Sequence, residues 1–508
     1  MLSRALLIVV GLLVTALPAV AAETSALAVS PSAFVRAQAA SGVQWHPWTD
    51  ASLAEAKQAN RSVYVFIGSP LSELTRATIN QTFTSAKTIA WLNENFFCIF
   101  VDADAQPDLA AYGQHYIRTI KQLQGSPVHL WLTPDLRIYD GANYLPPSEE
   151  WGKPGFLKAA RSALDSWAVD PARARALAAE AIDMMRVPPL GNAAKGDAAT
   201  KLDAAAKAWV ATLDPVNGGF GGAPKQPEPE LIRFLLTRSD TASRDAAINA
   251  AHALAKGAAR DSVDGGFFRR CIDEAWKEPY YQKTLLDQAR IALALFDAAD
   301  AAKDVTLRQA AIGSLDFALK ELRNPDGTFI AALDGTLEEN ADPAKRPKFV
   351  RVGSASTGSL GLLVAALQRS GEKRLAAVAK QLTGKLRKTL ESLPHTSGSS
   401  CSGTASDYAA LAQAYRSDKD DASANRLLAR ANQFYFDVTT GSYQASPVQL
   451  PAGVAIRTPT SGDTPSAEVL ALLAGVDAKT ADLIRRGLLS AIEYDDQPPG
   501  DVLLGLSH

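Results

Sequence analysis

Two hydroxyl side chains, Ser72 and Thr75, have the spacing of a redox-active pair of cysteines. They follow an apolar β-like run, Ser62–Gly68, at the start of a helix-like stretch, where a Cys-x-x-Cys motif would carry thiol chemistry. A hydroxyl cannot form a disulfide, and at neutral pH it offers no thiolate to attack one. We therefore predict a motif without redox activity, in which Ser72 caps the following helix.

The alternative use of this motif is a peptide-binding surface that needs no redox chemistry. Gly125-Ser126-Pro127 precedes a β-like run, and we expect Pro127 to be a cis-proline opposite Ser72 and Thr75. A cis X–Pro bond turns neighbouring backbone groups outward, where they can pair with an extended peptide. Nucleophilic catalysis by Ser72 would need a nearby base, and the adjacent Arg76 is a poor one.

Residues suited to sugar chemistry are present but far apart along the chain. Glycoside hydrolysis needs a carboxylic acid and a carboxylate on either side of one bond. Asp273, Glu274, Glu278 and Asp407 are available, and Asp273 and Asp407 are the ones we put forward. An isomerase would need a pair of bases, for which His252 and His395 are available. His252 lies in an Ala-rich segment and His395 in a Ser/Gly-rich loop, where structural roles are more common. Sequence alone leaves open whether any two of these side chains converge.

The spacing of the cysteines and histidines argues against a metal site, and the net charge argues against binding of nucleic acid. Cys98, Cys271 and Cys401 are widely spaced, and the six histidines are scattered, so we predict no bound metal and no cofactor. A Cys271–Cys401 disulfide remains an open possibility. With 52 basic and 54 acidic residues, the net charge of −2 provides no electrostatic footprint for nucleic acid.

The first residues are typical of a secretory signal. Arg4 supplies the positive end, Ala5–Ala16 the apolar stretch and Ala19-Val20-Ala21 a small-residue cleavage site. We therefore expect a signal peptide over residues 1–22, a flexible linker over 23–42, and a periplasmic or secreted protein without a membrane span. Its partner proteins and oligomeric state cannot be predicted.

Residues 43–168 alternate between strand and helix patterns. Apolar runs predict strands over 62–68, 96–103, 128–133 and 137–140, and helices are expected from about residues 50, 72, 108 and 155. Strands that alternate with helices and end in a hairpin indicate a thioredoxin-like α/β domain.

Residues 169–508 show almost only helical patterns. Apolar residues recur every three or four positions, as at Leu375, Val378, Leu382 and Leu386, which places one apolar stripe against a partner helix. Gly- and Pro-rich turns followed by aromatic residues separate the helices. Helix pairs joined in this way suggest an α/α toroid, although periodicity alone also allows an α-solenoid.

From Trp45 to Leu473, the ordered motifs resemble those of the spermatogenesis-associated thioredoxin-like family. The resemblance rests on short motifs in both parts of the chain: Ile67-Gly68, Asn93-Glu-Asn-Phe96, Leu132-Thr-Pro134, Gly218-Gly-Phe-Gly-Gly-Ala-Pro-Lys225, Gly265-Gly-Phe267 and Asp407-Tyr408. It implies a multidomain protein of α/β and all-α parts, in which a thioredoxin-like domain is followed by a six-hairpin (α/α)6 toroid.

The departures from the family fall at its most reactive positions. The two motif cysteines correspond to Ser72 and Thr75, and the histidines beside them to Glu73 and Arg76. In the barrel, the family's Pro-His-Phe-Glu-Lys corresponds to Pro279-Tyr-Tyr-Gln-Lys283, and an Asp-Ala-Asp stretch is reduced to Asp334-Gly-Thr. A glutamine neither holds nor releases a proton near pH 7, so catalysis through the family's site is not expected.

The resemblance places residues 269–287 at the mouth of the barrel, where related barrels bind sugars. Aromatic rings in this segment can stack on a sugar ring, and its polar groups can bond sugar hydroxyls. The candidate ligand-binding residues are Arg269, Asp273, Trp276, Tyr280, Tyr281, Gln282, Lys283 and Asp287. An equally open interpretation is structural, with Lys283 and Asp287 as an ordinary pair four residues apart on a helix.

These observations lead to two expected functions. The first is an exported, redox-inactive pseudoenzyme whose barrel binds an envelope glycan or peptide and serves as a binding or scaffold protein. The second is a carbohydrate-active hydrolase or isomerase of the barrel. A thiol-disulfide oxidoreductase is nearly excluded because the cysteine pair is missing.

Overall fold

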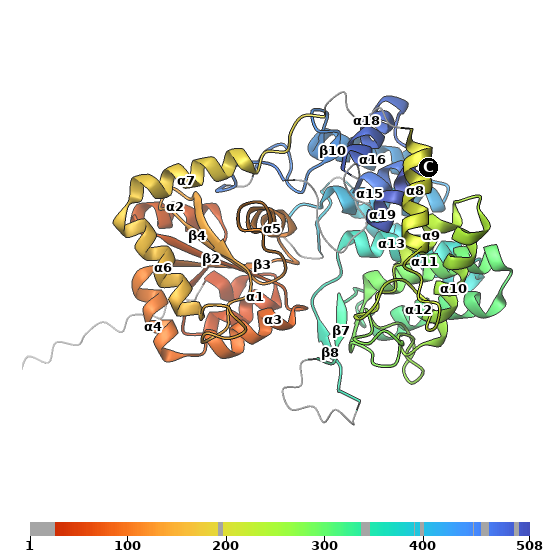
Figure 1. Cartoon of the computed structure of the whole chain (residues 1–508), viewed down its shortest axis with the longest axis horizontal. Helices are drawn as coiled ribbons and strands as arrows, with labels where there is room; N and C mark the ends of the chain where they lie inside the picture. The colour runs from red at the N-terminus through yellow and green to blue at the C-terminus, as the bar shows by residue number, and fades with distance from the viewer. Residues whose placement is uncertain are drawn as a thin grey trace, which may run out of the picture.

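A computed structural model describes residues 26–190, 197–336, 346–390, 392–396, 401–450, 452–458, 467–491 and 497–507. It shows an α/β domain beside a domain of paired helices (Figure 1). The expected signal peptide, residues 1–22, lies outside the described residues. No helix among the described residues has both the length and the apolar character needed to cross a membrane.

The α/β domain is built on a five-stranded sheet with the order β1-β3-β2-β4-β5. Its strands are β1 (Trp45–Pro47), β2 (Val63–Gly68), β3 (Phe97–Asp102), β4 (Val128–Leu132) and β5 (Ile138–Ala142). The first three are parallel to one another, and β4 and β5 run antiparallel to their neighbours. Every residue of β2, β3 and β4 is buried, which explains why their sequences are continuous apolar runs.

Helices cover both faces of this sheet and give it two apolar cores. One face is covered mainly by α2 (Asp50–Ala59) and α5 (Pro107–Lys121), and the other by α4 (Ala86–Asn95) and α6 (Phe156–Val169). The short α3 (Glu73–Ala77) follows β2 and continues into the π-helical turn Thr78–Thr82. This is the thioredoxin-like arrangement that the alternating pattern predicts.

The N-terminal and C-terminal limits of this domain differ from the sequence-based expectation. The expected linker forms three short helices, namely Ala26–Val29, α1 (Ala33–Ala37) and Gln38–Ala40. Leu27 and Val35 of this stretch are buried in the core, so it is not a flexible linker. Helix α7 (Pro171–Met184) also packs on this domain, whereas the expected boundary at residue 168 assigned it to the barrel. An Ala-rich helical pattern does not reveal which domain a helix covers.

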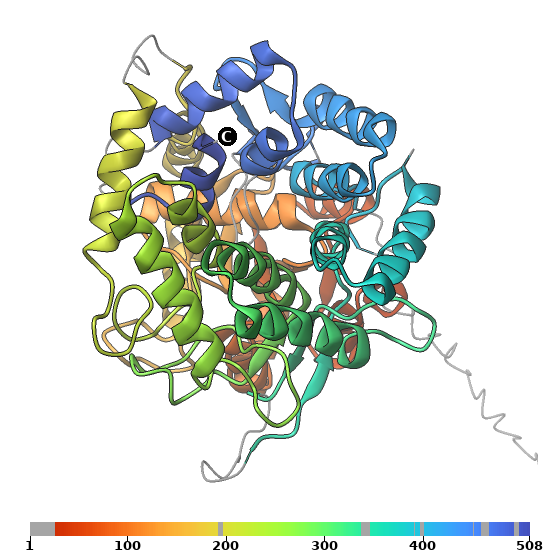
Figure 2. The same cartoon turned by 90° about the vertical axis from the view of Figure 1, so that its right-hand side faces the viewer.

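The helical domain is a closed ring of paired helices (Figure 2). In the described part of the chain, six inner helices each pack on the next, and the last returns to the first. They are α9 (Pro229–Leu236), α11 (Leu285–Ala302), α13 (Thr357–Arg369), α15 (Ala405–Ser417), α17 (Ala467–Ala474) and α19 (Gly500–Leu506). The closed ring identifies an α/α toroid and excludes the open solenoid that periodicity allowed.

Outer helices surround this ring and are packed on its members. They are α8 (Ala198–Val210), α10 (Thr241–Lys256), α12 (Val305–Glu321), α14 (Lys373–Leu386), α16 (Asp421–Tyr435) and α18 (Ala478–Ala491). Close packing within the ring depends on small residues: a Cβ on Gly361 would lie only 2.7 Å from the backbone carbon of Ala410. The remaining elements are the 3-10 turn Arg387–Thr389 and the β9 (Phe436–Asp437) and β10 (Ser442–Tyr443) hairpin.

Several described segments of the barrel reach the thioredoxin-like domain, including these two. The first is a small antiparallel sheet of β6 (Gln282–Thr284), β7 (Ala332–Asp334) and β8 (Val350–Val352). The second is the segment 452–458, which we call the strap. Its Val454 and Ile456 are buried in the sheet core of the other domain, and Trp48 Nε1 donates to the Ala452 carbonyl at 3.0 Å. The two domains therefore share one apolar core at the strap.

Candidate functional site

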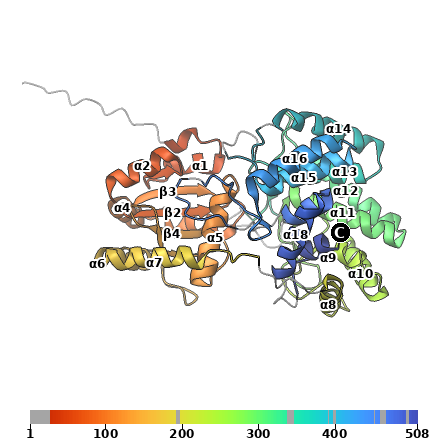
Figure 3. The same cartoon turned by 90° about the horizontal axis from the view of Figure 1, so that it is seen from above.

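A cavity of about 880 Å³ lies between the two domains. Helix α5 lies at the domain boundary and supplies part of its wall (Figure 3). From the thioredoxin-like domain, the lining includes Ser69, Leu71, Asp104, Gln114, Gly125 and Ser126. From the barrel, it includes Arg269, Asp287, Ser359, His395, Asp407 and Asp501. The thioredoxin-like domain thus covers the mouth of the barrel with the loops that surround Ser72 and Pro127.

The cavity wall combines hydroxyl, carboxylate and amide groups with small apolar side chains. Among the described residues that line it, none is Phe, Tyr or Trp. Such a wall can bind a polar ligand through hydrogen bonds, and carboxylates make these bonds stronger. It lacks the flat aromatic surface on which a sugar ring would stack.

Ser72 and Thr75 are committed to hydrogen bonds within the thioredoxin-like domain. Ser72 is the N-cap of α3, as predicted, and its hydroxyl accepts a bond from the Thr75 N–H at 3.2 Å. The Ser72 hydroxyl also donates to the Ser126 carbonyl at 3.4 Å, and the Thr75 and Ser126 hydroxyls are 3.2 Å apart. The Ser126–Pro127 bond is cis, which confirms the expected cis-proline. The motif keeps its geometry while oxygen replaces sulfur.

The cysteines provide no alternative redox pair. The structure describes all three, and Cys271 and Cys401 are not joined by a disulfide. Burial, with a contribution from Asp273, raises the pKa of Cys271 to about 12, and burial also raises the pKa of Cys98. A thiol with a raised pKa is a poor source of the thiolate that disulfide exchange requires.

Only part of the predicted segment 269–287 reaches the cavity. Arg269 and Asp287 line it, while Gln282 and Lys283 are buried beside it in β6. The Lys283 ammonium donates to the Asp261 carboxylate and to the Gly265 carbonyl. Helix α11 begins only at residue 285, so Lys283 and Asp287 are not a pair on one helix.

The predicted aromatic surface is not available to a ligand in the cavity. Trp276 is only 4% exposed, and its Nε1 donates to the Gly218 carbonyl at 3.1 Å. Tyr280 packs against the guanidinium of Arg270, and Tyr281 packs edge-on against Phe268. These rings hold the loops of the barrel together, which corrects the stacking role that their residue types suggested.

Asp273 and Asp407 do not form a catalytic pair. The Asp273 carboxylate folds back on its own loop and accepts bonds from the backbone N–H groups of Ala275, Lys277 and Glu278. Asp407, in contrast, is buried and lines the cavity. Asp273 is not among the residues that line this cavity, so the two carboxylates do not face one shared site there.

Asp407 instead pairs with His395, which the sequence favoured as structural. The Asp407 carboxylate accepts bonds from His395 Nδ1 at 2.6 Å, the Gly358 N–H at 2.6 Å and the Thr404 N–H at 2.7 Å. The backbone carbonyl of Asp104, in the other domain, accepts a further bond from the His395 ring. His395 therefore bridges the two domains at the cavity wall. Its place in a loop twelve residues before Asp407 gave no sequence signal for this contact.

The surroundings of this contact raise the pKa values of both His395 and Asp104. Burial lowers the pKa of His395, but the Asp407 and Asp104 carboxylates outweigh this effect and raise it above 6.5. Burial and the neighbouring Asp102 raise the pKa of Asp104 to about 7, although a hydroxyl bond from Ser69 opposes the shift. Both groups thus hold protons in the folded state that the unfolded chain would release.

This arrangement predicts a pH-dependent effect of Asp104→Asn. Between about pH 4 and 7, the folded protein keeps a proton on Asp104 that the unfolded chain has lost. The free energy of unfolding of the wild type therefore falls, through this group, as the pH rises over that range. The variant lacks this penalty, and its urea midpoint should rise relative to that of the wild type from pH 5 to pH 8. The comparison between variants is needed because burial lowers the pKa of His129 to about 3, which acts in the opposite direction. A relative midpoint that is constant, or that rises toward acid, would contradict this assignment.

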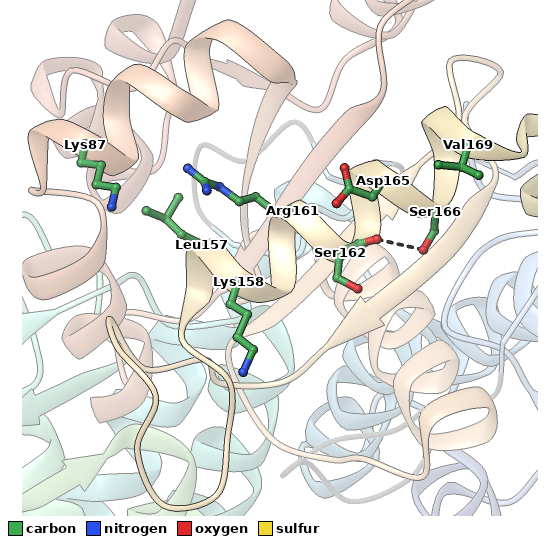
Figure 4. A pocket seen from close by; sticks show the side chains of 8 residues that line it. All are labelled: Lys87, Leu157, Lys158, Arg161, Ser162, Asp165, Ser166 and Val169. Carbon is green, nitrogen blue, oxygen red and sulfur yellow. Dashed lines mark hydrogen bonds between the residues drawn. The ribbon is translucent and has the colours of Figure 1, made fainter.

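A second depression, of about 620 Å³, lies over the outer face of α6. Its side chains include Lys87, Arg161 and Asp165 on an exposed surface (Figure 4). The Ser166 hydroxyl donates to the Ser162 carbonyl of the same helix at 2.8 Å. Surface charges on the exposed faces of α4 and α6 do not form an enclosed site, so the cavity between the domains is the better candidate. In the described ranges, no group of three or more His, Cys, Asp or Glu side chains is placed to hold a metal ion.

Comparisons with known proteins match both parts of the chain. A family model described as "Thioredox_DsbH: Protein of unknown function, DUF255" matches residues 24–186. Spermatogenesis-associated protein 20 of Mus musculus is 25% identical over 304 residues, which cover 58% of this chain and 38% of that protein. The human protein is 25% identical over 325 residues, covering 60% of this chain and 40% of its own length. The chain thus matches well under half of the length of these curated relatives.

Solved structures match the helical domain. Cellobiose 2-epimerase from Bacillus thermoamylovorans B4167 has a TM-score of 0.47 and 12% identity, over 61% of this chain and 97% of that chain. A sugar epimerase from a ruminal bacterium has a TM-score of 0.44 and 14% identity, over 58% of this chain and 86% of that chain. The sequence matches agree with the resemblance to the spermatogenesis-associated thioredoxin-like family, and the observed thioredoxin-like sheet and closed helical ring are the two parts that this resemblance implies, although Ser72 and Thr75 stand where the resemblance places the Cys-x-x-Cys.

Proposed function

We propose that this chain is an exported binding protein that holds a hydroxyl-rich ligand, such as a short glycan, between its two domains without redox chemistry. The observation that carries the proposal is the cavity of about 880 Å³ lined by both domains. Its volume falls within the range of small-molecule sites. Its lining offers many hydrogen-bonding groups, as sugar hydroxyls require.

The thioredoxin-like domain acts as a cover in this proposal. Its Ser72 and Thr75 hydroxyls are engaged with Ser126, and they offer no sulfur for electron exchange. The loops that carry them nevertheless face the cavity, through Leu71 and Ser126. The fold therefore supplies a shaped polar wall where relatives with cysteines would have thiol chemistry.

A sugar-modifying enzyme is the second candidate, and the buried His395–Asp407 pair is the observation that favours it. A carboxylate that orients a histidine is a common arrangement for proton transfer. However, the His395 ring donates to both Asp407 and the Asp104 carbonyl, so no ring nitrogen is available to accept a proton. Catalysis by this pair would require the Asp104 contact to separate, which makes binding the first candidate.

A thermal-shift screen of the mature protein tests the proposal. Envelope mono- and disaccharides form one set of probes, and short extended peptides form the other. A ligand present at a hundred times its dissociation constant should stabilise the protein by about 2.7 kcal/mol. Shifts with sugars support the proposal, shifts with peptides alone would replace the glycan by a peptide ligand, and no shift with either set would contradict it.

A further inference from the structure

A polar network joins the two domains beside the cavity. Arg76 of α3 donates from Nη1 to the Asp334 carboxylate at 3.3 Å and from Nη2 to the Thr336 hydroxyl. Gln282 donates from Nε2 to the Leu71 carbonyl at 3.0 Å and to the same Asp334 carboxylate at 2.8 Å. We call Arg76, Gln282, Asp334 and Thr336 the clasp. It joins the loop that carries Ser72 to strands β6 and β7 of the barrel.

Among the described residues, Arg76 of the other domain is the only cation that pairs directly with the Asp334 carboxylate. The Asp334 side chain is 0% exposed and the Arg76 side chain 13% exposed. The other contacts of the Asp334 carboxylate are neutral donors, namely Gln282 and the N–H and hydroxyl of Thr336. Separation of the domains at this point would expose the carboxylate and guanidinium to water, which can replace each of these hydrogen bonds.

The strap forms a contact of a different kind. Val454 and Ile456 are buried in the shared apolar core, and a Cβ on Gly453 would lie 2.8 Å from the Trp48 ring. The chain also crosses between the domains beyond α7, on the side opposite to α3 and β7 (Figure 1). Separation at the strap would expose apolar surface, so this contact is the more costly one to open.

The polar clasp is the contact that can open at low cost, and the apolar strap is the contact about which the domains can rotate. Local opening follows the elements with the least buried apolar surface, and hinge motions commonly admit ligands to sites between domains. We propose that the clasp opens while the strap holds, and that this opening admits ligand to the cavity. The part of the inference that concerns ligand admission rests on the proposed function, whereas the opening itself does not.

The rate at which a thiol inside the cavity reacts tests the opening directly. Ser359 lines the cavity and is largely buried, so Ser359→Cys places a thiol inside it. The probe is 5,5′-dithiobis(2-nitrobenzoate), and its reaction with the native cysteines is subtracted using the parent protein. When closing is faster than labelling, the labelling rate follows the population of the open form.

Adding Arg76→Met should accelerate labelling of Ser359→Cys about tenfold. The matched control is Arg233→Met, because the Arg233 side chain is 17% exposed against 13% for Arg76, and it pairs with Asp297 at 2.8 Å entirely within the barrel. Faster labelling with Arg76→Met alone supports the clasp. Equal rates with and without Arg76→Met, or the same acceleration from Arg233→Met, would overturn it.

Thr336→Val provides a second variant if Arg76→Met fails to fold. It removes a hydroxyl that accepts from Arg76 and donates to Asp334 while leaving the Arg76–Asp334 ion pair, and a smaller acceleration in the same direction is expected. No acceleration with Thr336→Val in that case would also overturn the clasp. A ligand screen without any shift would remove the proposed function and leave the labelling result standing. Unchanged labelling would remove the clasp and leave ligand binding standing.

Discussion

Replacing Asp407 by alanine is expected to destabilise the barrel by about 3–5 kcal/mol. The buried carboxylate accepts bonds from His395, from the Gly358 N–H on α13 and from the Thr404 N–H at the start of α15. Without it, these buried donors lose their acceptor and the His395 charge loses its closest partner. Urea unfolding followed by circular dichroism measures the loss.

Asp273→Ala is the control for this experiment. Asp273 was the other carboxylate considered for catalysis, and it also accepts backbone bonds, but within one partly exposed loop. A cap of this kind is typically worth about 1 kcal/mol. Similar losses for the two variants, or a loss below about 1 kcal/mol for Asp407→Ala, would show that Asp407 does not have the structural role assigned here.

Trp276→Ala is expected to cost about 3–5 kcal/mol, as truncation of a buried aromatic side chain does. The indole ring fills the space between two turns, because a Cβ on Gly219 would lie 2.8 Å from it and a Cβ on Gly257 2.5 Å from its own Cβ. The loss should appear as a lower melting temperature without any ligand. Tyr280→Ala is the matched control, because that ring is only half-buried and should cost much less.

The two outcomes for Trp276 separate structure from recognition. If the ring stacked on a ligand, Trp276→Ala would leave the melting temperature of the free protein unchanged and reduce only the ligand-induced shift. Because Trp276 is buried, we expect instead that Trp276→Ala lowers the melting temperature of the free protein. A free protein that melts at the wild-type temperature would restore the stacking role.

The elements of the fold could be predicted where local pattern determines them. Continuous apolar runs predicted β2, β3 and β4, because strands buried on both faces have no polar side to alternate with. The N-cap role of Ser72 is likewise a local feature, whereas the cis bond before Pro127 was predicted from the place that such a proline takes in thioredoxin-like folds. The toroid needed the resemblance, because ring closure depends on contact between α9 and α19 at opposite ends of the helical domain.

The candidate site could not be predicted in the same way, because it forms between segments that are distant in sequence. Arg76 and Asp334 are 258 residues apart, and Gln282 and Leu71 are 211 apart. Single residue types were also ambiguous: tryptophan suits both a sugar platform and a packed turn, and Trp276 has the second role. The sequence did single out Arg76 and Gln282 as departures from the family, and Asp334 as the start of a reduced acidic stretch, but it did not show that these residues meet.

The contact between Arg76, Gln282 and Asp334 gives one physical interpretation to these differences from the family. Arg76 stands beside the former redox motif, and Gln282 and Asp334 stand in the barrel segments that lost acidic or histidine side chains. In the folded chain these residues bond to one another across the domain boundary. Positions to which the resemblance assigns the family's histidine and glutamate, Arg76 and Gln282, thus form a contact between the domains here.

A cavity-filling variant tests the central claim most directly. Ser354 is an exposed side chain that lines the cavity, and Ser162 is an exposed side chain that lines the depression on α6. For the sugar with the largest thermal shift, Ser354→Trp should abolish the shift and Ser162→Trp should preserve it, with both free proteins melting close to the wild type. A full shift in Ser354→Trp, or its loss in Ser162→Trp alone, would contradict ligand binding between the domains.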